Sequence, residues 1–175
     1  VKEFPLTGNR RGCVQAVSGV DLTIYKGETL ALVGESGCGK STLGRLLIHL
    51  LPRTSGKIFF EGVEITALSD QAFIPYRRKM QMVFQDPYAS LNPRMTVRNI
   101  IAEPLTTYKV CPTKEKTTEL VLELMKAVGV PAEFLNRYPH QFSGGQRQRI
   151  GIARALALSP QLVVCDEPVS ALDVS

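Results

Sequence analysis

A glycine-rich segment in the first quarter of the chain constrains this sequence more than any other feature. It runs Gly34-Glu35-Ser36-Gly37-Cys38-Gly39-Lys40-Ser41-Thr42 and matches the pattern G-x-x-x-x-G-K-[ST] at every fixed position. Its glycines allow backbone turns tight enough for several N–H groups to converge on one phosphate. The Lys40 ammonium would reach the β- and γ-phosphates, and the Ser41 hydroxyl would ligate Mg²⁺. The segment therefore predicts a phosphate loop for a nucleoside triphosphate.

The residues on both sides of this loop agree with that interpretation. Residues 29–33 (TLALV) form a short apolar run that is typical of a buried strand. Leucines follow the loop at the spacing of one helix face: Leu43, Leu46, Leu47 and Leu50. A strand, a loop and a helix in this order place the phosphates at a helix N-terminus, where the dipole favours negative charge. The alternative, a chance glycine turn, would not explain both flanks.

Composition limits the remaining possibilities. A chain of 175 residues that is 44% hydrophobic and 21% charged can bury one core, so we expect a soluble, cytosolic globular domain. The net charge of +5 suits a phosphate ligand but does not indicate nucleic acid. No apolar run approaches the roughly 18 residues of a membrane span, and no signal peptide is recognisable. The cysteines are scattered and the histidines isolated, which favours neither a disulfide framework nor a metal site built from them.

Strand-like and helix-like segments alternate along the chain. Residues 57–60 (KIFF), residues 80–84 (MQMVF) and Leu162–Cys165 are further strand candidates. Between about 86 and 159 the pattern changes to loops punctuated by proline and to helical spacing over residues 117–128. We therefore expect an α/β fold in which residues 1–85 and 160–175 form the core, with a mainly parallel sheet. Residues 86–159 would form an inserted helical subdomain.

Two carboxylates follow the last strand candidate. In enzymes with a phosphate loop, an Asp at the tip of a buried strand holds Mg²⁺, usually through water, and an adjacent Glu can polarise the attacking water. Asp166 and Glu167 fit these two roles. Taken alone, a solvated strand end is the better explanation of an apolar run followed by Asp-Glu. Together with the upstream phosphate loop, the pair indicates a hydrolytic site.

A second phosphate-binding feature settles the family. Phe142-Ser143-Gly144-Gly145-Gln146 precedes a helix expected to run through Leu158, so a Ser N-cap and two glycines would expose N–H groups at its start. An ordinary capped helix is the alternative, but such a group makes sense if it serves a nucleotide held by a partner. A chain with GESGCGKST, FSGGQ, LVVCDEP and then Ser170-Ala171-Leu172-Asp173 resembles the ATP-binding-cassette (ABC) ATPases, a family of P-loop NTPases.

The resemblance implies roles for further residues. Gln85 matches the glutamine that contacts Mg²⁺ and the attacking water and links the site to a transmembrane partner. Phe4 matches the aromatic residue that stacks on adenine, with Ala16 packed nearby, although a core phenylalanine remains an alternative because the first strand looks very short or missing. Asp173 would lie at a dimer seam. The γ-phosphate of the opposite subunit would be contacted by Ser143, Gly144, Gly145 and Gln146.

A finer resemblance concerns the transported solute. Residues 85–95 (QDPYASLNPRM) are similar to a segment in the ATPase subunits of oligopeptide, dipeptide and nickel importers. Residues 34–45 (GESGCGKSTLGR) and residues 139–149 (PHQFSGGQRQR) resemble the F-type ATPase of those importers. This implies ATP and Mg²⁺ as cofactors and a head-to-tail dimer with a second ATPase, either a D-type subunit or a second copy. It also implies two membrane permeases, indirect action with an external solute-binding protein, and a peripheral place on the cytoplasmic face of the membrane. The residues do not decide between peptide and nickel.

Family members carry a switch histidine about 30 residues after the catalytic Glu, and this chain has none there. We expect the chain to be a fragment that lacks the γ-phosphate sensor and a strand between residues 29–33 and Leu162–Cys165, and therefore to be poorly soluble and inactive alone. Two other functions stay open at this point. One is a soluble ABC protein acting on DNA or ribosomes, which the lack of heptads disfavours. The other is a binding module that does not hydrolyse ATP.

Overall fold

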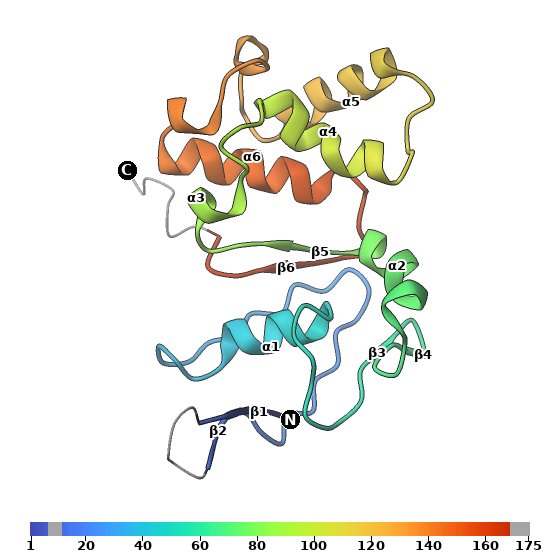
Figure 1. Cartoon of the computed structure of the whole chain (residues 1–175), viewed down its shortest axis with the longest axis vertical. Helices are drawn as coiled ribbons and strands as arrows, with labels where there is room; N and C mark the ends of the chain where they lie inside the picture. The colour runs from blue at the N-terminus through green and yellow to red at the C-terminus, as the bar shows by residue number, and fades with distance from the viewer. Residues whose placement is uncertain (7–11, 169–175) are drawn as a thin grey trace. The chain divides into compact units, whose positions relative to one another are not determined.

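The computed structural model describes residues 1–6 and 12–168, which divide into two units, Val1–Phe73 and Ile74–Ser175 (Figure 1). Helix α2 (Asp70–Lys79) carries the chain from the first unit into the second. The described residues form three two-stranded sheets, two of them antiparallel and one parallel. None of the described helices is long and apolar enough to cross a membrane.

The first unit holds both antiparallel pairs and helix α1 (Lys40–Leu47). Strand β1 (Lys2–Pro5) pairs with β2 (Cys13–Val17), and β3 (Phe59–Phe60) pairs with β4 (Val63–Glu64). The sequence predicted neither β2 nor β4. It also extended the β3 strand to residues 57–60, whereas only its last two residues join a ladder.

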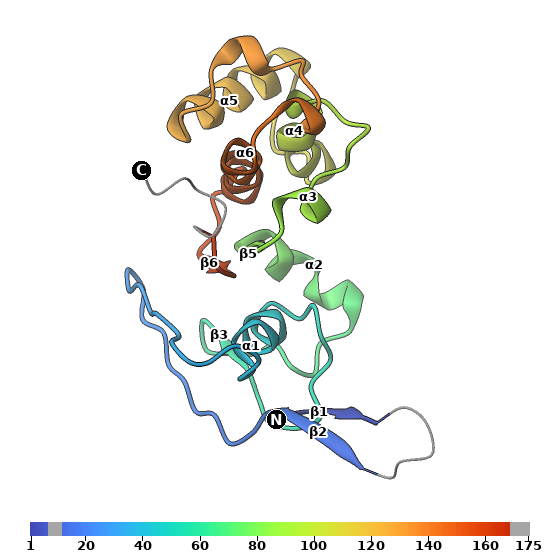
Figure 2. The ribbon, with the colours of Figure 1, turned by 90° about the vertical axis from the view of Figure 1, so that its left-hand side faces the viewer.

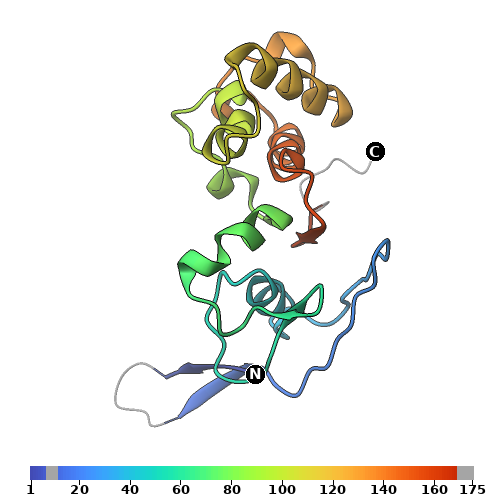
Figure 3. The same cartoon turned by 90° about the vertical axis from the view of Figure 1, so that its right-hand side faces the viewer.

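The predicted strand at residues 29–33 is wrong for the described structure, since this stretch joins no sheet there and runs as irregular coil (Figure 3). Its apolar side chains are exposed, and Val33 reaches 94% exposure. A strand persists only when a neighbour takes up its N–H and C=O groups, and none of the described strands pairs with this one. The apolar pattern indicates a segment suited to burial, but a strand forms only where a neighbouring strand pairs with it.

Helix α1 ends at Leu47 rather than continuing to Leu50. His49 adopts a left-handed conformation with φ 60°, its N–H donates to Leu46 O at 3.1 Å, and Leu50 N–H donates to Arg45 O at 2.9 Å. These bonds form a Schellman motif, which satisfies the last helical carbonyls and stops the helix. The leucine spacing identified the helix, and local backbone geometry decided its end.

In the second unit, β5 (Met80–Val83) and β6 (Leu162–Cys165) pair in parallel, with Met80 opposite Leu162 and Val83 opposite Cys165. Both strands were predicted, β6 with its exact bounds. Helices α3 (Pro87–Ser90), α4 (Val97–Thr107), α5 (Lys114–Ala127) and α6 (Gly144–Leu156) accompany this pair, with short 3₁₀ turns at Ala132–Phe134 and Pro139–Gln141. Helix α6 lies between the strands and helices α4 and α5 (Figures 1 and 2).

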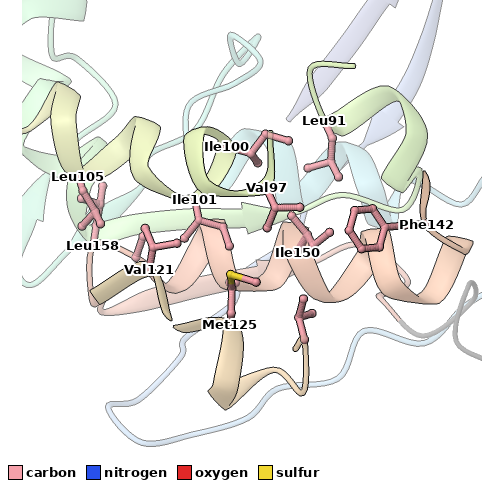
Figure 4. Packing of buried hydrophobic residues seen from close by; sticks show 13 residues of the cluster. Leu91, Val97, Ile100, Ile101, Leu105, Val121, Met125, Phe142, Ile150 and Leu158 are labelled. Atoms are coloured by element: carbon pink, nitrogen blue, oxygen red, sulfur yellow. The ribbon is translucent and has the colours of Figure 1, made fainter. Parts of the chain in front are cut away.

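The main hydrophobic core lies in this unit, between α4, α5 and α6 (Figure 4). Ile101 on α4, Met125 on α5 and Ile150 on α6 are fully buried within it. Helix α6 also contacts β5, and the start of α6 and the tips of β5 and β6 belong to one unit. The sequence-based boundary of a separate helical subdomain at 86–159 stays a prediction.

Candidate nucleotide-binding and hydrolysis site

The phosphate loop turns sharply where the sequence predicts it. Gly37 and Gly39 adopt φ values of 80° and 100°, a left-handed region that disfavours residues with a Cβ atom. Gly39 is the N-cap of α1, and no side chain caps this helix start. A Cβ atom on Gly39 would lie 2.1 Å from the backbone oxygen of Ala16 on β2, so only glycine fits between the loop and that strand. The structure thus brings the Ala16 backbone to the loop, whereas the predicted place of Ala16 beside Phe4 and the adenine stays a prediction.

The Lys40 ammonium bonds backbone carbonyls of the phosphate loop itself. Its Nζ donates to Gly34 O at 2.6 Å and to Glu35 O at 2.7 Å, and it lies 3.7 Å from Cys38 Sγ. These carbonyls are neutral acceptors, whereas a phosphate oxygen carries negative charge and attracts the ammonium more strongly. A phosphate entering the loop would therefore take the ammonium from the loop carbonyls.

Alkylation of Cys38 is expected to block nucleotide binding, because its exposed thiol lies inside the loop and any added group would occupy the phosphate cradle. Mg-ATP should protect Cys38 from maleimide. Mass-spectrometric mapping with and without nucleotide measures this. Cys13, which is also exposed, should label equally in both conditions and serves as the control. Equal labelling of Cys38 in both conditions would reject the expectation.

The predicted carboxylates lie at the carboxyl ends of the parallel strands. Asp166 N–H donates to Val83 O at 2.9 Å, which extends the ladder one residue beyond β6, and Asp166 is buried, at 8% exposure. Glu167 is exposed and adopts φ 46°, an uncommon conformation for a residue with a side chain. Partial burial raises the pKa of the preceding Cys165 thiol, so this side chain adds no charge at neutral pH.

Gln85 meets this pair, as the sequence predicted. It follows β5, and its Nε2 donates to Glu167 Oε2 at 2.5 Å. The tip of the strand pair therefore gathers an amide and two carboxylates from segments about 80 residues apart. These three residues belong to the second unit, whereas the phosphate loop belongs to the first.

The residues at the strand tip suit Mg²⁺. This ion prefers oxygen ligands and is usually held by one or two carboxylates together with phosphates and water. Asp166 Oδ2 is buried and accepts no hydrogen bond from the described residues, although Asp166 has other interactions. Gln85 at the same strand tip offers an amide oxygen. Ser41, the other predicted ligand, lies on α1 in the first unit, and its place in the metal site stays a prediction. In the part of the chain that the structure describes, no three His, Cys, Asp or Glu side chains cluster as a metal site.

Ser143 caps α6 as predicted. Its Oγ accepts from Gln146 N–H at 3.3 Å, and Gln146 Oε1 accepts from Ser143 N–H at 3.1 Å. This reciprocal capping box, whose glutamine half was not predicted, holds the first turn rigid. The two glycines between them, Gly144 and Gly145, leave the helix start without bulky side chains.

Phe4 and Asp173 are the two candidate residues whose predicted contacts remain open. Phe4 lies on β1 and is 37% exposed, with Lys2 Nζ 4.8 Å from its ring centre, so it is not a core phenylalanine. Its contact with adenine stays a prediction. Asp173, like Ser170, lies outside the described residues.

Sequence reasoning assigned no role to Arg147 and Gln148. Both are buried in α6, at 6% and 2% exposure. Gln148 Nε2 donates to Phe84 O at 3.3 Å, beside Gln85. Helical spacing could have placed these residues on the inner face of α6, but long polar side chains are usually assumed to point to solvent.

Comparison with known proteins agrees with this geometry. A family model described as ABC transporter matches residues 17–170. In the solved dimeric structure of the ATP-binding cassette MJ0796 bound to ADP and Pi, the matching chain is 33% identical. The alignment has a TM-score of 0.89 and covers 99% of this chain and 73% of that one. The predicted fold class, a P-loop NTPase of the cassette type, is therefore confirmed.

Several curated relatives share more than half of their aligned residues with this chain. The oligopeptide transport ATP-binding protein OppF of Bacillus subtilis is 58% identical over 166 residues, 94% of this chain and 54% of the relative. OppF of Escherichia coli is 54% identical, over 93% of this chain and 48% of the relative. The dipeptide transport ATP-binding protein DppF of Lactococcus lactis is 51% identical, over 100% and 57%. The chain thus spans about half the length of the curated relatives it matches. It belongs to the ABC transporter family.

Proposed function

We propose that this protein is the ATP-binding and ATP-hydrolysing subunit of a membrane transporter that imports oligopeptides or dipeptides. The observation that carries the hydrolytic part is the strand tip, where Gln85 bonds Glu167 directly beside the buried Asp166. The phosphate loop, with Lys40 over its carbonyls, supports the binding part. The peptide is supported by the curated relatives, which are described as oligopeptide and dipeptide transport proteins.

In this mechanism, Lys40 leaves Gly34 O and Glu35 O and binds the β- and γ-phosphates of ATP. Ser41, Gln85 and Asp166 would hold Mg²⁺, which would neutralise charge that develops on the phosphates. Glu167 would accept a hydrogen bond from the attacking water and orient it toward the γ-phosphate, with Gln85 holding the carboxylate. Phosphate and ADP would then leave.

The helix start at Ser143 supports a second ATPase subunit as a partner. In a head-to-tail dimer, residues 143–146 of one subunit would contact the γ-phosphate bound by the other, closing the dimer before hydrolysis and opening it afterwards. The dimeric state of the MJ0796 cassette supports this arrangement. Two membrane permeases and an external solute-binding protein would complete the importer, with this subunit on the cytoplasmic face of the membrane. Nucleic acid has no place in this function.

ATP-driven peptide uptake tests the proposal. The complete natural subunit, its partner ATPase and the permeases are placed in vesicles, and uptake of a labelled oligopeptide is measured with its solute-binding protein. Uptake should require Mg-ATP and should stop with Lys40→Ala. A labelled nickel salt serves as the competing solute. Uptake of nickel without peptide, or peptide uptake that continues without ATP, would overturn the proposal.

A further inference from the structure

Helix α6 contacts the chain on both sides of Gln85. Three of its side chains contact residues 84–90: Gln148 Nε2 donates to Phe84 O at 3.3 Å, the Arg147 guanidinium lies 3.6 Å from the centre of the Tyr88 ring, and Arg154 Nη1 donates to Ser90 O at 2.6 Å. The first contact is to the residue before Gln85, the second to the residue three positions after it, and the third to Ser90, the last residue of α3. The backbone around Gln85 is thus fixed to one helix.

Of these three side chains, Arg147 is the one whose guanidinium makes two different interactions. Its Nε donates to Pro139 O at 2.7 Å, and its guanidinium faces an aromatic ring, so a buried cation is held by one carbonyl and one π-surface. A buried charge without such partners would be costly. The planar guanidinium can stack on the ring and bond the carbonyl together, which a lysine ammonium cannot do in the same way.

Tyr88 connects this contact to Gln85. Tyr88 N–H and Ala89 N–H both donate to Asp86 Oδ1, at 2.8 and 3.2 Å, so the first turn of α3 is locked to the residue next to Gln85. Through this turn, a change in the backbone position of Tyr88 would reach Asp86 and, next to it, Gln85. On the other side, Arg147 directly follows Gln146, which belongs to the capping box of α6.

We propose that Arg147 is a positioning residue. Through Tyr88 it couples the start of α6, residues 143–146, to the Gln85 amide that bonds Glu167. A γ-phosphate at the helix start would then set the geometry of the hydrolytic tip in the same chain. This inference rests on the proposed ATPase function. Loss of the contact should slow hydrolysis while leaving nucleotide affinity unchanged, because neither side chain belongs to the phosphate loop.

A structural role would give a different result. If Arg147 only stabilised the helical core, its loss would lower the melting temperature without a specific effect on kcat. Arg149 offers a matched control, because it is an exposed arginine on the same helix, directly after Gln148. Its Nη1 donates to Val128 O at 3.1 Å, outside residues 84–90. Tyr88→Phe provides a second control, since it keeps the ring and removes only the hydroxyl.

The test compares Arg147→Met, Tyr88→Ala, the double variant, Arg149→Met and Tyr88→Phe in the complete transporter. Steady-state kcat, nucleotide Kd, melting temperature and amide hydrogen exchange of residues 84–90 are measured. Arg147→Met and Tyr88→Ala should each lower kcat by about tenfold, with Kd within about twofold, as for loss of a positioning contact. The double variant should be no worse than either single one, because both remove the same coupling. The two controls should match the wild type.

Hydrogen exchange separates this inference from the proposed function. Arg147→Met should speed exchange of residues 84–90 and Arg149→Met should not, whether or not the protein hydrolyses ATP. If the wild type hydrolyses no ATP but exchange follows this pattern, the ATPase proposal fails and the coupling between α6 and the Gln85 segment stands. If exchange is unchanged in Arg147→Met, or if kcat falls equally in Arg149→Met, the positioning role of Arg147 is wrong.

Discussion

Glu167→Gln is expected to abolish steady-state ATP turnover while ATP still binds. Glutamine has the shape of glutamate and can still accept the hydrogen bond from Gln85 Nε2, but it cannot act as a base toward water. Loss of a general base lowers rates by about 10²- to 10⁴-fold. Because ATP is bound but not cleaved, the complete natural subunit should also accumulate as an ATP-bound dimer. Phosphate release and gel-filtration mass with Mg-ATP measure both effects.

Glu61→Gln is the control for this substitution. Glu61 is also an exposed glutamate in a left-handed conformation, with φ 49° against 46° for Glu167, but it lies in the turn between β3 and β4. The substitution Glu61→Gln should leave ATP turnover unchanged. Turnover of Glu167→Gln at the wild-type rate would show that another group activates the water.

Lys40→Ala is expected to weaken ATP binding by one to two orders of magnitude. The substitution removes the ammonium that lies over the loop, and a charge-assisted hydrogen bond contributes about 1.5–3 kcal/mol. Calorimetric titration with Mg-ATP measures the change. Lys26, an exposed lysine in the same unit, provides the matched control as Lys26→Ala. Unchanged affinity together with unchanged turnover would remove Lys40 from the site.

A melt without nucleotide completes the Lys40 experiment. The ammonium bonds Gly34 O and Glu35 O, so its removal also loosens the empty loop. The bonds are exposed, and exposed contacts contribute little to global stability. The melting temperature of Lys40→Ala should therefore stay close to that of the wild type. A large drop would mean that the loss of affinity reflects unfolding of the loop rather than a missing phosphate contact.

Local patterns predicted much of this site. The glycine spacing fixed the loop, where left-handed φ values at Gly37 and Gly39 are required. The apolar run before Asp166 identified β6 with its exact bounds. The family resemblance, rather than a local pattern, assigned Gln85 to the site of Glu167. The parallel pairing of β5 and β6 explains why the two residues meet, because the carboxyl ends of both strands reach the same edge.

The remaining features depend on partners that a local pattern does not contain. Residues 29–33 have the composition of a strand but find no ladder among the described residues, whereas β1 and β2 pair with each other although β2 was not predicted. Arg147 was missed for the same reason. Its burial depends on the Tyr88 ring, 59 positions earlier in the chain. Non-local contacts of this kind need the three-dimensional structure.

Phosphate release from ATP by the complete wild-type transporter tests the central claim most directly. The claim is that this family member hydrolyses ATP with Asp166, Glu167 and Gln85 and does not merely bind it. We expect steady phosphate release that requires Mg²⁺, stops with EDTA and is lost in Glu167→Gln. Tight ATP binding without phosphate release in the wild type would contradict it, and would make the protein a nucleotide-binding module rather than an ATPase.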